Sequence, residues 1–131
     1  MLNQVYTFAY SNDYTPAMPI VELGISLPKR SQADVTITAL LDSGSDGTML
    51  PVDLLDQIGA KPVGQGQIRG ILGHSRPIEL YLIKLYIGSH QLHAIRVIGI
   101  ETTEEPIVGR NVLNHLVVTL NGLASVTEIA G

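Results

Sequence analysis

The sequence contains no cysteine and no tryptophan, and its only aromatic residues are one phenylalanine and five tyrosines. Without cysteine the chain can form neither disulfides nor thiolate metal sites, and nothing indicates an oxidising compartment. Charged residues are also scarce, at 15% of the 131 residues, where an average domain has about a quarter. Hydrophobic residues make up 45%, which supplies an ample core and argues against disorder.

Further absences concern partners and location. The formal net charge is −4 and no run of lysine or arginine occurs, so the basic footprint of a nucleic-acid-binding protein is missing. No apolar run approaches the ~20 residues that span a bilayer, and residues 1–6 do not resemble a signal peptide. We therefore predict a cytoplasmic protein without nucleic-acid or membrane partners.

What the chain does contain is a series of short, β-rich apolar segments separated by turn signals. We predict strands at residues 20–27, 35–41, 78–87, 92–100, 117–120 and 125–129, and short helices at 51–58 and 110–115. This pattern predicts an all-β fold, a small closed β-barrel or sandwich with one or two short helices, in one domain over residues 1–131. The terminal strands would be exposed edges, and pairing with a second copy is one way to cover them.

One acidic residue stands at the end of a predicted strand. Apolar residues alternate at period two over residues 35–41, and Asp42-Ser43-Gly44 follows at once. Gly44 allows a tight turn whose amides face the carboxylate, and the Ser43 hydroxyl can bond to a facing loop. All three residue types are also turn formers, so the triplet alone equally suits an ordinary turn.

A single aspartate imposes a condition on any hydrolytic chemistry. Peptide hydrolysis by carboxylates needs two of them, one ionised to activate water and one protonated to polarise the carbonyl. Two carboxyls about 3 Å apart share one proton, because both cannot ionise together. The sequence has no second Asp-Ser-Gly triplet. The partner of Asp42 would therefore be Asp42 of another copy, across a two-fold axis.

The wider context of Asp42 is more specific. The segment ALLDSGSDGTML, residues 39–50, closely resembles the active-site segment of retroviral proteases, and IVGRNVL, residues 107–113, resembles the second signature of that family. Residues 68–73, IRGILG, are similar to the tip of the family's flap, and residues 119–121 to its C-terminal strand. The match covers residues 35–121 and leaves out the N-terminal arm 1–18 and the C-terminal tail 122–131.

The resemblance implies a retropepsin-like aspartic endopeptidase that acts on peptides or proteins as a two-fold homodimer, without metal or cofactor. Asp42 carries over as the catalytic residue, and Ser43 and Gly44 carry over as supports of the active-site loop. The substrate would lie in a tunnel between the two Asp42 loops and two flaps. The longer segment 51–67 and the N-terminal extension are closer to cellular, including bacterial, relatives than to a viral enzyme.

The resemblance also assigns residues around Asp42. Asp46 would pair with Arg110 and approach the substrate backbone, while Asn111 would hydrogen-bond near Thr48 and so brace the loop. The expected substrate-binding residues are Asp46, Gly70, Ile71 and Leu72.

Some features depart from the viral pattern or leave alternatives open. Leu72 stands where viral flaps have glycine, and Arg69 places charge near the tunnel mouth. A catalytically weak or inactive peptide-binding or dimerisation module of the same fold is therefore the alternative, and a self-processing enzyme is a third hypothesis. His90 and His93 could form a metal pair, but no third ligand stands nearby and a structural role is favoured.

Overall fold

The computed structural model describes residues 4–70 and 72–131, which form two β-sheets and two short helices. The smaller sheet has the antiparallel order β1 (Val5–Ala9), β10 (Val126–Ala130), β9 (Val117–Asn121). The order of the larger sheet is β2 (Ile20–Ser26), β3 (Val35–Leu41), β8 (Ile107–Val108), β4 (Thr48–Pro51), β7 (His90–Ile100), β6 (Ser75–Ile87), β5 (Pro62–Arg69). The helices are α1 (Val52–Gln57) and α2 (Arg110–Leu113). The predicted all-β class is confirmed.

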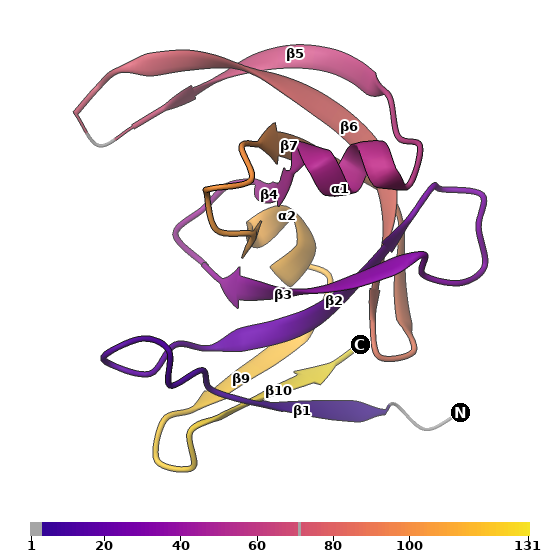
Figure 1. The fold of residues 1–131 in the computed structure, drawn as a ribbon. Helices are drawn as coiled ribbons and strands as arrows, with labels where there is room; N and C mark the ends of the chain where they lie inside the picture. The colour runs from indigo at the N-terminus through magenta and orange to yellow at the C-terminus, as the bar shows by residue number, and fades with distance from the viewer. Residues whose placement is uncertain (1–3, 71) are drawn as a thin grey trace.

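Figure 1 shows how these elements are layered. The long β5–β6 hairpin arches over α1 at the top, and the smaller sheet of β1, β9 and β10 lies at the bottom. Strand β2 pairs with β3 on one side and also with β6, where Gly24, Ile25 and Ser26 oppose Tyr86, Leu85 and Lys84. The larger sheet therefore bends back on itself and encloses most of the apolar side chains.

The period-two alternation predicted for residues 35–41 is confirmed. Ala39 and Leu41 are buried on the inner face of β3, whereas Thr36 and Thr38 are exposed on the outer face. The other predicted strands are present with shifts of up to three residues at their ends. The second helix is shorter than predicted, because after Leu113 the His115 amide bonds to the Val112 carbonyl and tightens the chain into a turn.

Four strands were not predicted from the sequence, namely β1, β4, β5 and β8. Strand β5, PVGQGQIR, contains proline and two glycines, which have low β propensity. It exists because it pairs along its length with β6, from Pro62 opposite Tyr81 to Arg69 opposite Ser75. Strand β1 forms for the same reason, through pairing with β10 at the other end of the chain.

The core joins the two regions that resemble protease signatures. Leu23, Leu50 and Leu55 are fully buried, and so are Val108 and Val112 of the second signature. The apolar residues of that signature are thus packing residues, and their burial fixes β8 and α2 beneath the loop that follows β3.

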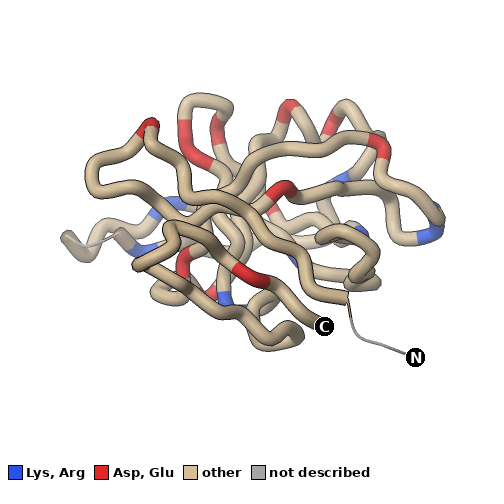
Figure 2. Tube along the Cα trace, turned by 90° about the horizontal axis from the view of Figure 1, so that it is seen from below, with Lys and Arg blue, Asp and Glu red and all other residues tan. Residues whose placement is uncertain are grey.

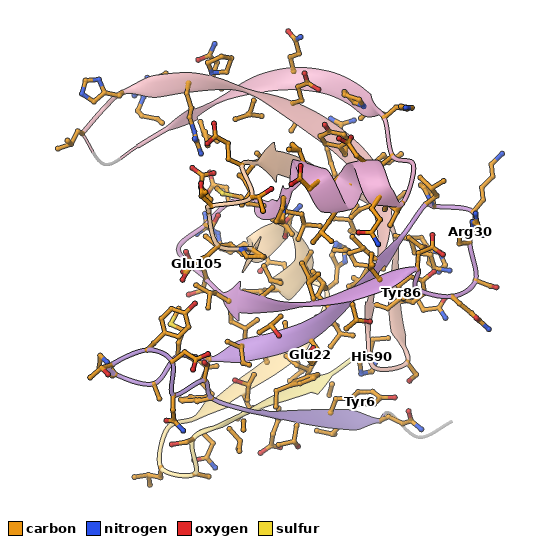
Figure 3. All side chains as sticks on the ribbon, viewed as in Figure 1. Tyr6, Glu22, Arg30, Tyr86, His90 and Glu105 are labelled. Carbon is orange, nitrogen blue, oxygen red and sulfur yellow. The ribbon has the colours of Figure 1, made fainter. Side chains whose placement is uncertain are left out.

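Polar contacts fasten the chain on the side away from that loop. Figure 3 labels Tyr86, whose hydroxyl lies 2.8 Å from the Ser26 hydroxyl, while the buried Lys84 ammonium donates to the Arg30 carbonyl at 2.9 Å. Near the N-terminus, the Tyr6 hydroxyl donates to Ser89 and the Tyr6 ring meets His90 edge-on. These contacts dock β1 onto the turn between β6 and β7.

Two findings concern metal ions and membranes. Within residues 4–70 and 72–131, no three or more His, Cys, Asp or Glu side chains gather in a way that could hold a metal ion. In the same residues, no helix has the length and apolar character needed to cross a membrane.

Truncating a core leucine tests the packing. Leu55 is fully buried and Leu72 is 85% exposed, so Leu55→Ala and Leu72→Ala remove the same atoms from opposite environments. We expect Leu55→Ala to lower the free energy of unfolding by about 2–5 kcal/mol, and Leu72→Ala to change it by less than about 0.5 kcal/mol. Urea unfolding followed by circular dichroism measures both, and equal effects would contradict the observed packing.

Candidate active site

Asp42 lies where the two signature segments meet. Strand β3 runs parallel to β8, with Leu40 opposite Ile107 and Leu41 opposite Val108. The Asp42 amide continues this ladder by donating to the Val108 carbonyl at 3.1 Å. The backbone of Asp42 is therefore held by the core, while its side chain is half-buried at the start of a turn.

The turn wraps around the Asp42 carboxylate. The Gly44 amide donates to Asp42 Oδ1 at 2.9 Å, and the Ser45 amide donates to the Asp42 carbonyl at 3.1 Å. A Cβ atom on Gly44 would lie 3.1 Å from Oδ1, which leaves little room for a side chain beside the carboxylate. This is the local structure expected of an Asp-Ser-Gly turn, and it fixes one carboxylate oxygen in position.

Arg110, the first residue of α2, holds the same turn through three contacts. Its amide donates to the Ser45 carbonyl at 2.9 Å, Nη1 donates to the Ser43 carbonyl at 2.7 Å, and Nη2 pairs with Asp46 Oδ1. The predicted contact between Asp46 and Arg110 is thus present. The Asp46 side chain is 93% exposed, so the ion pair itself contributes little stability. The bonds to backbone carbonyls are what position the turn.

Thr48 and Asn111 form a second connection behind the turn. The fully buried Thr48 hydroxyl accepts from the Gly109 amide at 3.1 Å and donates to Asn111 Oδ1 at 2.8 Å. Asn111 Nδ2 in turn donates to the Arg96 carbonyl of β7 at 2.9 Å. The hydrogen bond predicted near Thr48 is therefore present, and it links β4, β7 and α2.

Gly109 was not singled out from the sequence, although the structure depends on it. A Cβ atom at this position would lie 2.2 Å from the Gly47 carbonyl oxygen and 2.9 Å from that of Ser45. No side chain fits between the two segments. The glycine that begins the Gly-Arg-Asn signature was the available signal, because a glycine often marks a close backbone approach.

A cavity of about 950 Å³ opens between Asp42 and the end of the β5–β6 hairpin. Its lower wall is the turn from Asp42 to Gly47, and its upper wall is the hairpin around Gly70. Of the expected site residues, Asp42, Gly44, Asp46 and Gly70 line this cavity. Residues of the wall that the sequence did not point to are Gln67, Ser75, Arg76 and Ile98, and no role was expected of Met49, Ile68 and Ile107 although they lie in the quoted segments.

The remaining expected residues lie elsewhere. Thr48 and Asn111 lie behind the turn, and Ser43 is exposed at its surface. Leu72 is exposed at the hairpin tip and is not part of the cavity wall, so its contact with a substrate stays a prediction. Ile71 lies outside the described residues.

Removing the Thr48 hydroxyl tests the connection behind the turn. Thr48→Val keeps the shape but leaves the buried Gly109 amide and Asn111 oxygen without their partner. We expect a loss of about 1–3 kcal/mol in the free energy of unfolding. Thr7→Val, on the exposed face of β1, is the matched control and should change it by less than about 0.5 kcal/mol. If urea unfolding finds Thr48→Val as stable as the control, the hydroxyl does not hold this region.

The comparisons with known proteins identify the fold. No protein-family model and no curated protein matches the sequence. Among solved structures, a retropepsin-like aspartic protease from Rickettsia conorii is similar over 99% of this chain and 94% of its own, with a TM-score of 0.66 and 12% identity.

Two viral enzymes are similar at 18% identity. EIAV protease in complex with the inhibitor HBY-793 matches 82% of this chain and 93% of its own, with a TM-score of 0.53. Simian foamy virus (mac) protease matches 70% and 87%, with a TM-score of 0.50. Likeness at such low identity concerns the fold and leaves activity to be tested. The chain has a retropepsin-like fold.

Proposed function

We propose that this protein is an aspartic endopeptidase whose active site forms between two copies of the chain. The observation that carries the proposal is the setting of Asp42. Its carboxylate lines a cavity of about 950 Å³, and its backbone is fastened to β8, the segment before the Gly-Arg-Asn signature. In a retropepsin-like fold, this is a carboxylate in a fixed position facing a space large enough for an extended peptide.

The chemistry follows from two such carboxylates. The ionised Asp42 of one copy takes a proton from water, and the water oxygen attacks the peptide carbonyl carbon. The protonated Asp42 of the other copy donates to the carbonyl oxygen, which gives a tetrahedral diol. The diol collapses when the C–N bond breaks. The first Asp42, now protonated, donates its proton to the leaving nitrogen, and the second Asp42, now ionised, takes a proton from a diol hydroxyl as the carboxyl product forms. No metal or cofactor enters these steps.

The cavity walls suit a peptide in an extended conformation. The lower wall supplies apolar contacts through Met49, Ile98 and Ile107, which would exclude water from the reacting carbonyl. The β5–β6 hairpin covers the opposite side and acts as the flap in this proposal. Gly70 faces the cavity from the hairpin and brings backbone, not side chain, towards the substrate.

In the proposed dimer, the second copy pairs with the free edge of β9. Strand β9 is the end strand of the smaller sheet, and residues 116–127 contain no charged side chain. Edge strands usually carry lysine or other charges that prevent pairing, and β9 lacks that protection. Val117 is 65% exposed and Leu120 is 57% exposed on it. The opposite edge strand, β1, is already partly covered, because the Gln4 carbonyl and Tyr6 contact the β6–β7 turn.

The position of β9 favours an isologous contact. The strand follows α2 after three residues, and α2 holds the Asp42 turn. Two β9 strands paired antiparallel across a two-fold axis would bring both Asp42 turns to the same side of the dimer. The apolar side chains on this edge would be buried in the pairing.

Replacing the catalytic carboxylate tests the reaction. We expect Asp42→Asn to reduce cleavage of a mixed peptide library by about 10²- to 10⁴-fold, because it removes both the acid and the base. Asp34→Asn, an exposed aspartate before β3, should leave cleavage unchanged. The measurement is mass spectrometry of the library from about pH 4 to 7, and activity should be favoured on the acidic side, where the paired carboxyls hold one proton.

The outcome separates the proposal from its alternative. Equal cleavage by the wild type and Asp42→Asn would exclude the aspartic mechanism. Peptide binding without cleavage in either protein would favour a peptide-binding module of the same fold.

A charge on the β9 edge tests the dimer. We expect Val117→Lys to shift the sedimentation mass from dimer to monomer and to abolish cleavage, because a charged side chain would have to be buried between the two copies. Val63→Lys places the same charge on the edge strand β5, where Val63 is 56% exposed, and should leave the mass unchanged. A Val117→Lys protein that stays dimeric would show that the copies meet elsewhere.

A further inference from the structure

The charged side chains that line the Asp42 cavity differ in whether they have an ion-pair partner. Asp42, Asp46, Arg69 and Arg76 line it. Asp46 is paired with Arg110, and Arg76 Nη2 lies 2.8 Å from Glu104 Oε1 in the loop after β7. Arg69 differs, because no carboxylate oxygen of the described residues lies within 4 Å of its guanidinium. Among the described residues, Arg69 is thus a cation on the hairpin side of the cavity without a carboxylate partner.

The backbone of Arg69 is held in position by the pairing of β5 with β6. Arg69 is the last residue of β5 and lies opposite Ser75 of β6. Just beyond it, the Gly70 amide donates to the His74 carbonyl at 2.9 Å and continues the ladder into the turn. Figure 2 shows blue segments near this end of the hairpin. The guanidinium is therefore carried by a paired strand rather than by an unsupported loop.

Arg76 is already paired with Glu104, which makes it the less suitable of the two arginines on the wall to bind a carboxylate from outside the chain. The neighbouring Glu105 is engaged separately, since it accepts a hydrogen bond from the Tyr14 hydroxyl at 2.6 Å. This hydrogen bond to a carboxylate raises the pKa of the Tyr14 phenol. The loop 101–106 therefore neutralises Arg76 and leaves Arg69 as the group that can receive a negative charge from outside the chain.

We propose that Arg69 selects peptides that carry an aspartate or glutamate side chain close to the bond to be cleaved. A guanidinium offers a planar fork of donors that matches a carboxylate in geometry and charge. A lysine or arginine at the same substrate position meets repulsion. The apolar residues Met49, Ile98 and Ile107 of the lower wall favour apolar side chains at the neighbouring positions. This inference rests on the proposed function, since it names the substrate class of the same cavity.

The test uses peptides that differ at one position only. Each series has an apolar sequence with glutamate, glutamine or lysine placed in turn at every position around the centre. Binding is measured by fluorescence anisotropy on the Asp42→Asn protein, so that cleavage does not interfere, and cleavage is measured on the wild type. At the best position, glutamate should bind about fivefold more tightly than glutamine in low salt.

Two substitutions assign that preference to one side chain. Arg69→Gln should remove the difference between glutamate and glutamine, and Arg69→Glu should reverse it in favour of lysine. Lys29→Gln, an exposed cation in the turn after β2 and outside the cavity, is the control and should keep the wild-type preference. Sedimentation of each variant reports whether the dimer is intact.

The results distinguish this inference from the proposed function. A glutamate preference that survives Arg69→Gln, or an equal loss of binding for all three peptides, overturns the role of Arg69. A fall in dimer mass with Arg69→Gln also overturns it, because Arg69 would then pair with the second copy. Selective binding that depends on Arg69, with no cleavage by the wild type, supports the inference and rejects the peptidase.

Discussion

The position of the Asp42 turn depends on one buried hydroxyl, that of Thr48. Thr48 accepts a hydrogen bond from the Gly109 amide and donates one to Asn111, so it joins segments about sixty residues apart at a point without solvent. The backbone approach at Gly109 is so close that no side chain can enter. Because α2 is fixed there, Arg110 can reach the Ser43 and Ser45 carbonyls and hold the turn that contains Asp42.

The cavity therefore has two walls of different character. The lower wall is tied to the core through β3, β8 and α2, whose apolar residues are buried. The upper wall is the β5–β6 hairpin, whose outer part is held chiefly by its own ladder and by the Arg76–Glu104 pair. A rigid wall suits groups that must be placed for chemistry, and a hairpin suits a cover that admits and selects a ligand.

The second constraint is that one chain alone has a single Asp42 carboxylate and leaves the edge of β9 open. Each chain supplies one carboxylate in this setting and the uncharged edge of β9, and a two-fold partner would satisfy both needs at once. The absence of charge over residues 116–127 is costly for an isolated chain, because an open apolar edge invites aggregation. The proposed dimer gives that edge a purpose, and it makes any hydrolytic activity dependent on protein concentration.

The sequence by itself determined the all-β class, the strand that ends at Asp42, and the contacts from Arg110 to Asp46 and from Asn111 to Thr48. These follow from local periodicity and from two long signatures. The tertiary structure alone decided the rest. Strand β5 contains proline and two glycines, which have weak β propensity, and it forms by pairing with β6. Strand β1 forms by pairing with β10 at the other end of the chain. The need for glycine at position 109, and the lack of a carboxylate partner for Arg69 within residues 4–70 and 72–131, likewise depend on which groups come near in the fold, and no local pattern encodes that.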